Sequence, residues 1–145
     1  MKILILGAGA VGGYWGARLA QAGIDVTFLL REKRAELVRR NGLVVKSPKG
    51  DAVVPVKVVT GGDEGGPYDV VILACKAYDL ESAIASIAPA VGSDTVIVPM
   101  LNGHAHFTTL DARFGASRAP AFVTDARLVH ARTNARHLAE LTAAE

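Results

Sequence analysis

One short glycine pattern restricts the possible folds of this chain more than any other feature. Residues 7–12 read Gly-Ala-Gly-Ala-Val-Gly, a G-x-G-x-x-G sequence, and they directly follow the apolar run 3–6. In such a pattern the first glycine makes a tight turn, the second leaves room for a pyrophosphate, and the third lets a helix pack closely on a strand. The pattern therefore predicts a strand, a phosphate-binding turn and a helix in direct succession.

The residues around the glycine pattern complete a strand-helix-strand unit. The run 3–6 is continuously apolar, as is typical of a strand buried on both faces of a parallel sheet. Apolar residues recur at three- and four-residue steps over 11–22, Gly23 stands where glycine commonly ends a helix, and 25–30 is a second apolar run. Because this context is complete, we interpret the pattern as a dinucleotide-binding site rather than a structural turn alone. The phosphates are expected on the turn and the helix N-terminus, at Gly7, Ala8, Gly9, Ala10, Val11 and Gly12.

The rest of the chain continues the alternation of strands and helices. We expect helices over 31–40, 80–88 and 103–114, and buried strands over 69–75 and 95–98. A strand pair is expected from 43–46 and 53–59, with weaker strand candidates over 121–123, 127–130 and 137–141. The glycine-rich loop 61–67 is not interpreted as a linker between domains, because the strand after it needs the first sheet as its neighbour. The prediction is an α/β fold, a Rossmann-like, doubly wound, mostly parallel sheet with helices on both faces, over residues 1–145.

Composition narrows the class of partner. A chain of 145 residues with 16 basic and 14 acidic side chains has the size of one domain and little excess charge. This balance argues against nucleic acid and anionic membranes as partners and favours a small molecule. The single cysteine, Cys75, cannot form an internal disulfide, so we expect a cytoplasmic protein in which Cys75 is a buried small hydrophobe. His104 and His106 lack the further ligands that a zinc site needs, so we expect no metal and surface histidines at a helix start.

The end of the second strand decides between the two nicotinamide cofactors. An acidic side chain there would bind a free ribose 2′-hydroxyl, but this chain has Arg31, 24 positions after Gly7, with Arg34 nearby. Guanidinium groups can hold a 2′-phosphate with charge-assisted hydrogen bonds, which favours NADP(H). Glu32 leaves an alternative open, since a strand that ends one residue later would put its carboxylate at the discriminating position.

Two further polar residues follow predicted strands. Lys76 and Asn102 each stand just past the carboxyl end of a strand, which is the edge where open α/β sheets bind ligands. Lysine can contact a cofactor or a carboxylate, and asparagine can bind a carboxamide or a hydroxyl. Position alone does not separate such roles from ordinary loop polarity.

Taken in order, these segments resemble the N-terminal domain of the ketopantoate reductase (2-dehydropantoate 2-reductase) family. The resemblance rests on residues 1–3 leading into the glycine pattern, 29–31 (Leu-Leu-Arg), 71–77 (Val-Ile-Leu-Ala-Cys-Lys-Ala) and 99–103 (Pro-Met-Leu-Asn-Gly). It implies NADPH-dependent reduction of ketopantoate to pantoate, in the pathway to pantothenate and coenzyme A. It also implies that Arg31 binds the 2′-phosphate and that Lys76 and Asn102 line the nicotinamide and substrate end.

The resemblance has two departures. Residues 119–126 resemble a family strand that touches the cofactor, which makes Ala126 a candidate contact, but Ala121 stands where family members usually have glycine. The family's proton-donating lysine and an active-site carboxylate belong to a C-terminal helical domain that we expect to be absent from residues 1–145. We therefore expect cofactor binding without efficient turnover, because reduction of a ketone needs a proton donor at its oxygen.

Other functions remain open from the sequence. The chain can be a non-catalytic NADP-binding module, or the cofactor domain of a dehydrogenase acting on another 2-keto acid or hydroxy acid. A cofactor domain without its partner domain exposes an apolar face, so we also expect a homo-oligomer or association with a separate helical domain.

Overall fold

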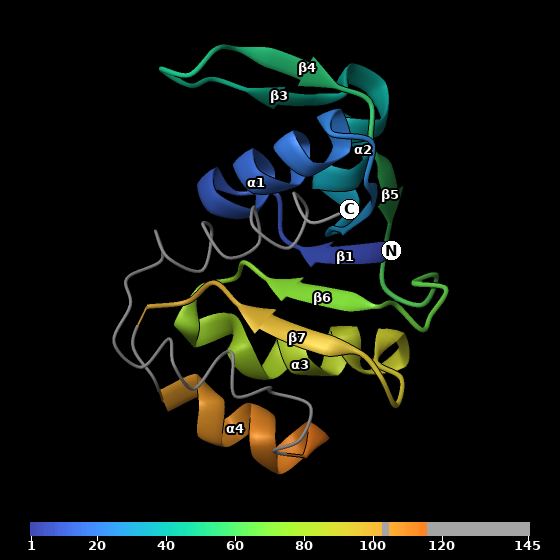
Figure 1. Cartoon of the computed structure of the whole chain (residues 1–145), viewed down its shortest axis with the longest axis vertical. Coiled ribbons are helices and arrows are strands. Elements are labelled where there is room, and N and C mark those ends of the chain that lie inside the picture. The colour runs from blue at the N-terminus through green and yellow to red at the C-terminus, as the bar shows by residue number, and fades with distance from the viewer. Residues whose placement is uncertain (103–104, 116–145) are drawn as a thin grey trace.

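A parallel five-stranded sheet forms the centre of the fold. The computed structural model of the chain describes residues 1–102 and 105–115 (Figure 1). The strand order is β5-β2-β1-β6-β7, and every neighbouring pair is parallel. The strands are β1 (Lys2–Leu6), β2 (Asp25–Leu29), β5 (Lys57–Val59), β6 (Val70–Leu73) and β7 (Val96–Pro99).

Helices cover both faces of this sheet. On β1, Ile3 and Ile5 pack into a cluster with residues of α1 and α2, whereas Leu4 packs into a second cluster with residues of α3 and α4. This alternation follows from the two-residue period of a strand. The predicted doubly wound α/β fold is confirmed. The helices are α1 (Ala10–Gln21), α2 (Glu32–Asn41), α3 (Leu80–Ile87) and α4 (Ala105–Phe114), with short 3-10 turns η1 (Ala77–Asp79) and η2 (Ala88–Ala90).

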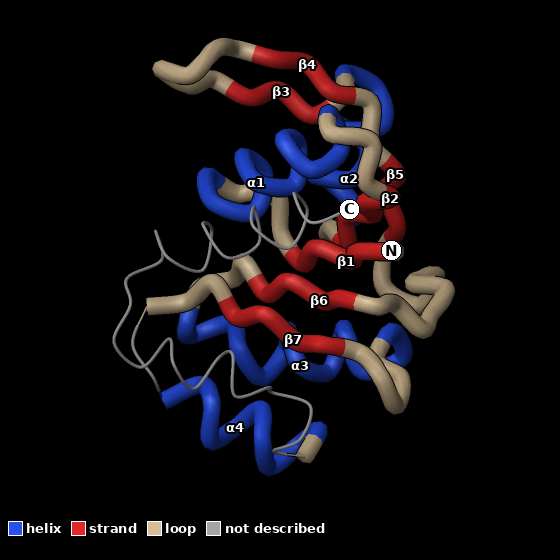
Figure 2. Tube along the Cα trace, in the orientation of Figure 1, coloured by secondary structure: helices blue, strands red, loops and turns tan. Residues whose placement is uncertain are grey.

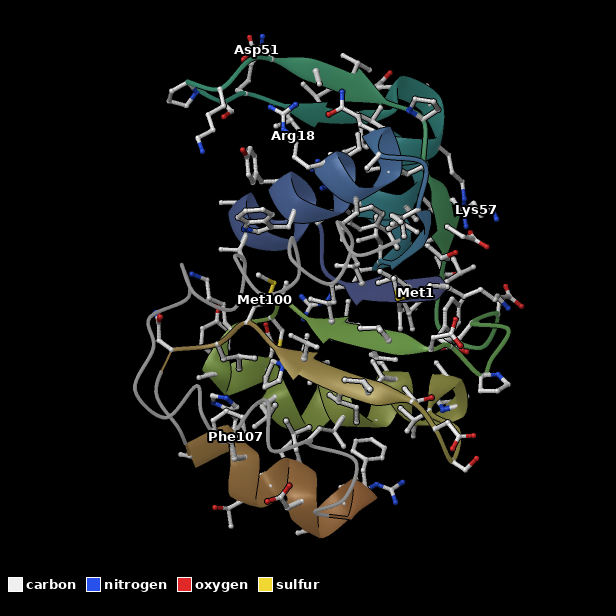
Figure 3. All side chains as sticks on the ribbon, viewed as in Figure 1. Met1, Arg18, Asp51, Lys57, Met100 and Phe107 are labelled. Carbon is white, nitrogen blue, oxygen red and sulfur yellow. The ribbon has the colours of Figure 1, made fainter. Side chains whose placement is uncertain are left out.

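A β-hairpin lies outside the central layers. Strands β3 (Leu43–Val45) and β4 (Ala52–Val54) pair antiparallel and contact α1 on its side away from the sheet, as Figure 2 shows. Arg18 of α1 points toward the hairpin in Figure 3 and donates a 2.7 Å hydrogen bond to the backbone oxygen of Gly50 in the hairpin turn.

The prediction of one strand over 53–59 was wrong. Val54 pairs with Leu43 in the hairpin, whereas Val58 pairs with Phe28 in the central sheet. Pro55 lies between the two short strands. Because proline has no backbone N–H to donate to a strand ladder, the pairing with β3 ends there and the chain joins β2 instead.

Gly16 allows α1 to lie against the sheet. A Cβ atom at this position would come within 2.3 Å of Cζ of Phe28 and 2.6 Å of Cδ1 of Ile5. The glycine spacing of this segment therefore does more than form a phosphate turn, since it also sets the distance between α1 and the strands beneath it.

The remaining expectations have mixed outcomes. The loop before β6 is no domain linker, because β6 pairs with β1 of the first unit. His106 was expected at the surface but is buried, with 6% exposure, because it lies on the inner face of α4 with Leu110. Ala126, His104 and the three weaker strand candidates lie outside the described residues. No helix in the described part of the chain is long and apolar enough to cross a membrane.

Candidate cofactor-binding cleft

The strand order creates a cleft at the carboxyl edge of the sheet. The chain moves from β1 to β2 and β5 on one side, then returns to β6 and β7 on the other. The connections after β1 and β6 therefore diverge, which is where open α/β sheets bind ligands. A cleft of about 460 Å³ lies at this place, and it is lined by Gly7 and Gly9 from the first connection and by Ala74 and Lys76 from the second.

The first and third glycines of the pattern are closely packed against neighbouring atoms. Gly7 has a φ of +96°, and a Cβ atom there would come within 3.0 Å of the backbone oxygen of Ala74. A Cβ atom at Gly12 would come within 2.3 Å of the backbone oxygen of Gly7 and 2.6 Å of Cβ of Ala74. Gly7 thus has the positive φ of a tight turn, as predicted for the first glycine of the pattern, and Gly12 has the close packing predicted for the third.

The second glycine is different because it faces open space. Gly9 is the N-cap residue of α1, with a φ of −79°, and a Cβ atom there would meet no described atom within 4 Å. Within the described residues no side chain caps this helix start, and its first turn has no acidic residue. The backbone N–H groups of the first turn have no partners within the helix, so they and the helix dipole favour an anion here. The residues present therefore fit the pyrophosphate of a dinucleotide.

Two arginines line the opposite side of the cleft. Arg31 is the N-cap residue of α2, and its side chain is 85% exposed. Arg34 follows one turn later and its Nη2 lies 3.4 Å from the backbone oxygen of Ala8, so it also contacts the glycine turn. The predicted pair of cations is brought together at one ligand-sized cleft.

Glu32 turns away from this cleft. Strand β2 ends at Leu29, and Glu32 is the first residue of α2 rather than a residue at the strand end. Its carboxylate lies 3.5 Å from Nη1 of Arg39 on the same helix, and it does not line the described cleft. The alternative that Glu32 occupies the discriminating position is not supported by this geometry.

Of the other predicted site residues, some line the cleft and some do not. Lys76 lines it and is the N-cap residue of η1, three residues after the end of β6 at Leu73. Asn102 is exposed and follows β7 at the same edge of the sheet, but it is not among the cleft residues. Ala10 instead lines a second hollow of about 450 Å³ between α1 and the hairpin, and Val11 is 40% exposed.

Cys75 was predicted to be a buried small hydrophobe, but it is only half-buried and lines the cleft. It packs against the cluster beneath α3 because the chain leaves the sheet at this point. Burial raises the pKa of the Cys75 thiol, and the nearby Asp79 carboxylate raises it further. The thiol is therefore protonated at neutral pH and is a weak nucleophile.

One helix, α3, also lines the cleft, with residues that were not predicted from the sequence. Asp79 at the start of α3 lines the cleft, as do Ser82, Ala83 and Ser86 one and two turns later. Their three- and four-residue spacing on one helix face is a signal that could have found them, since α3 is the next helix after β6, whose end was already a candidate site. Among the described residues, no group of three or more histidine, cysteine, aspartate or glutamate residues is arranged to hold a metal ion.

Comparison with known proteins gives this arrangement a family. The profile of the family described as "Ketopantoate reductase PanE/ApbA" matches residues 3–141, which is nearly the whole chain. The chain belongs to the ketopantoate reductase family. The resemblance carried by the glycine pattern and the later motifs is thereby confirmed.

Relatives of this ketopantoate reductase family member are longer than the chain itself. It is 47% identical over 114 residues to the "Uncharacterized oxidoreductase YkpB" of Bacillus subtilis (strain 168), covering 79% of this chain and 37% of that protein. The structure of 2-dehydropantoate 2-reductase from Geobacter metallireducens GS-15 is similar with a TM-score of 0.76 and 39% identity, over 81% of this chain and 39% of that one. The matched part of the chain therefore covers little more than a third of the length of these relatives.

A further similar structure has a different name. It is the ternary structure of D-mandelate dehydrogenase with NADH and anilino(oxo)acetate, with a TM-score of 0.71 and 27% identity over 77% of this chain and 37% of that one. The fold of this chain is thus shared with a dehydrogenase whose structure is described as containing NADH, and family membership supports NAD(P)-dependent oxidoreductase chemistry in general terms.

Proposed function

We propose that residues 1–145 form the NADP(H)-binding domain of an enzyme that reduces ketopantoate to pantoate, in the pathway to pantothenate and coenzyme A. The observation that carries the cofactor assignment is the position of Arg31. It lies two residues past the end of β2 and lines the cleft together with Arg34, while Glu32 is engaged with Arg39 outside it. A site that binds a free 2′-hydroxyl has a carboxylate at this strand end, whereas a cation there suits a 2′-phosphate.

Each part of the cleft has a role in this proposal. The glycine turn and the open start of α1 at Gly9 bind the pyrophosphate. Arg31 and Arg34 bind the 2′-phosphate, and Lys76 lies toward the nicotinamide and substrate end. As the family resemblance implies, Asn102 lines the nicotinamide and substrate end, and Ala126 contacts the cofactor. When bound, NADPH supplies the hydride that reduces the carbonyl carbon.

The assignment is tested by calorimetric titration of the full chain with NADPH and with NADH. We expect NADPH to bind about tenfold more tightly than NADH. Arg31→Ala is expected to weaken NADPH binding about tenfold and to change NADH affinity by less than about twofold. The loss of NADPH affinity lies at the lower end of the range for charge-assisted hydrogen bonds because the guanidinium is exposed. Arg40→Ala removes the same charge from the last turn of α2, outside the cleft, and is expected to change neither affinity. Equal NADPH and NADH affinities would contradict the NADP(H) assignment.

Turnover by residues 1–145 alone is expected to be slow. Hydride transfer to a ketone builds negative charge on its oxygen, and a proton donor is needed there. Lys76 is one of the cationic residues that line the described cleft, and we propose that it positions the ligand rather than donating the proton. NADPH oxidation with added ketopantoate measures this directly, and a rate equal to that of a complete reductase would contradict the proposal.

A second substrate class is supported by one comparison. D-mandelate dehydrogenase, whose structure with NADH is similar to this chain, carries the name of an enzyme for another 2-hydroxy acid. Ketopantoate and benzoylformate, offered as alternative substrates to the enzyme with NADPH or NADH, separate the two possibilities by which pair is turned over.

A further inference from the structure

An ion pair joins the two walls of the cleft. Arg31 comes from the junction of β2 and α2, and Asp79 comes from the end of η1, 48 residues later in the chain. Nη2 of Arg31 lies 3.3 Å from Oδ1 of Asp79, and both residues line the cleft. The cation assigned to the 2′-phosphate thus already has an anionic partner within the protein.

We propose that Asp79 is a specificity-determining residue whose carboxylate weakens the preference of this cleft for a 2′-phosphorylated dinucleotide. The inference rests on the proposed function, because it assumes that a nicotinamide dinucleotide binds in this cleft. In chemical terms, the Arg31 guanidinium attracts a phosphate on the ribose 2′-oxygen, whereas the Asp79 carboxylate repels it.

The two possible ligands respond differently to this carboxylate. A 2′-phosphate brings up to two negative charges to Arg31, and it has to share the guanidinium with Asp79 or displace it. The unshared carboxylate then lies beside a like charge, which opposes binding. A free 2′-hydroxyl is neutral and can donate a hydrogen bond to a carboxylate, so NADH does not meet this repulsion.

The backbone of Asp79 is fixed on both sides, so its carboxylate belongs to the wall of the cleft. The Asp79 N–H donates to the backbone oxygen of Lys76 at 2.9 Å, and Oγ of Ser82 donates to the backbone oxygen of Asp79 at 2.8 Å. The Asp79 side chain is 32% exposed, compared with 85% for Arg31. Arg31 is therefore the partner that moves when a ligand arrives, while Asp79 stays in place.

The exposure of Arg31 also limits the size of the effect. Pairs of exposed charges interact weakly in water, and salt screens them further. We expect the carboxylate to change the relative affinities by about fivefold, rather than by the orders of magnitude that a buried pair would give. Asp79 therefore moderates the preference set by Arg31 and Arg34 and does not reverse it.

The test compares Asp79→Asn with the wild-type full chain by calorimetric titration with NADPH, NADH and 2′,5′-ADP. The last ligand has the 2′-phosphate but no nicotinamide, so it reports on this end of the cleft alone. Asp79→Asn is expected to tighten NADPH and 2′,5′-ADP about fivefold and to leave NADH unchanged or weaker. Glu81→Gln removes the same charge from the exposed face of the same helix, outside the cleft, and is expected to shift all three affinities by less than about twofold.

The possible outcomes separate the inference from the proposed function. If the wild-type chain binds neither dinucleotide, the proposed function fails and the inference fails with it. If the wild type binds NADPH but Asp79→Asn leaves the ratio of NADPH to NADH affinity unchanged, or lowers it, only the inference is overturned. Asp79→Ser keeps a side chain suited to the start of α3, and it serves as the second variant if the melting curve of Asp79→Asn shows unfolding.

Discussion

Replacing Gly9 by alanine tests whether the start of α1 binds the phosphates. A Cβ atom at Gly9 would meet no described atom within 4 Å, so the added methyl group would enter open space at the start of α1. A pyrophosphate bound to the first turn of α1 needs this space, because its oxygens approach the backbone N–H groups closely. Gly9→Ala is therefore expected to weaken NADPH binding by about 10- to 100-fold.

The same substitution is expected to leave stability almost unchanged. The φ of −79° at Gly9 is ordinary for alanine, and fixing a less flexible residue contributes about 0.4–1 kcal/mol through the unfolded state. Glycine is, however, a better N-cap than alanine by about 0.5 kcal/mol. These effects oppose each other, so the net change is within about 0.5 kcal/mol, or about 2 °C in Tm.

Gly12→Ala is the matched control, because it adds the same methyl group three residues along the same helix. There the Cβ atom would lie 2.3 Å from the backbone oxygen of Gly7, so α1 and the turn have to separate. Overpacking against backbone costs about 3 kcal/mol, which corresponds to a fall of about 9 °C in Tm for a chain of this length.

Differential scanning fluorimetry and NADPH titration measure the two effects side by side. The expected pattern is a Gly9→Ala variant that is stable but binds poorly, and a Gly12→Ala variant that is destabilised. A Gly9→Ala variant with wild-type Tm and wild-type NADPH affinity would refute the assignment of the phosphates to this turn. A fall in Tm for Gly9→Ala as large as that for Gly12→Ala would refute the account of the open space.

Two other residues give predictions that depend on pKa shifts. Nζ of Lys57 lies 2.7 Å from Oδ1 of Asp25 and lowers the pKa of that carboxyl below its ordinary 3.8. The ion pair therefore stabilises the fold at pH values above the pKa of Asp25 in the unfolded chain. This stabilisation is lost as pH falls through the pKa of Asp25 in the folded chain. Asp25→Asn is expected to lower Tm slightly at pH 7 and to have a progressively smaller effect as pH falls through the folded pKa of Asp25, and a loss of Tm that does not change with pH would contradict this. Cys75, whose thiol pKa is raised by burial, is expected to react with iodoacetamide more slowly in the folded chain than in denaturant, and more slowly still with NADPH, as mass spectrometry would show. Unchanged labelling with saturating NADPH would place the ligand away from Cys75.

The first strand-helix-strand unit could be predicted because all of its signals are local. An apolar run, a glycine pattern, a helical period and Gly23 lie within thirty residues, and the structure has β1, α1 and β2 within a residue or two of the expected limits. Gly23 has a φ of +85° just after α1, which is the conformation that a glycine at this place favours. The cations of the cleft followed from the same local unit, because Arg31 comes directly after its last strand.

Features that depend on distant partners could not be predicted in this way. The division of 53–59 into β4 and β5 depends on which neighbour each half pairs with, and Pro55 only marks the boundary. His106 lies on a short helix whose buried face is decided by packing against the sheet and α3. A surface position predicted from the polarity of its side chain was therefore wrong. The ion pair between Glu32 and Arg39 could have been predicted only if the first residue of α2 had been known.

The charge around a bound ribose is set by two connections that the sequence separates. In the order β2-β1-β6, the residues after β2 and after β6 lie on either side of the glycine turn after β1, so a ligand on that turn meets both. The usual inference from the end of β2 alone counts Arg31 and omits Asp79, which is 3.3 Å away. A relative with the same arginine and a neutral residue at the position of Asp79 should therefore prefer the 2′-phosphorylated cofactor more strongly than this chain does.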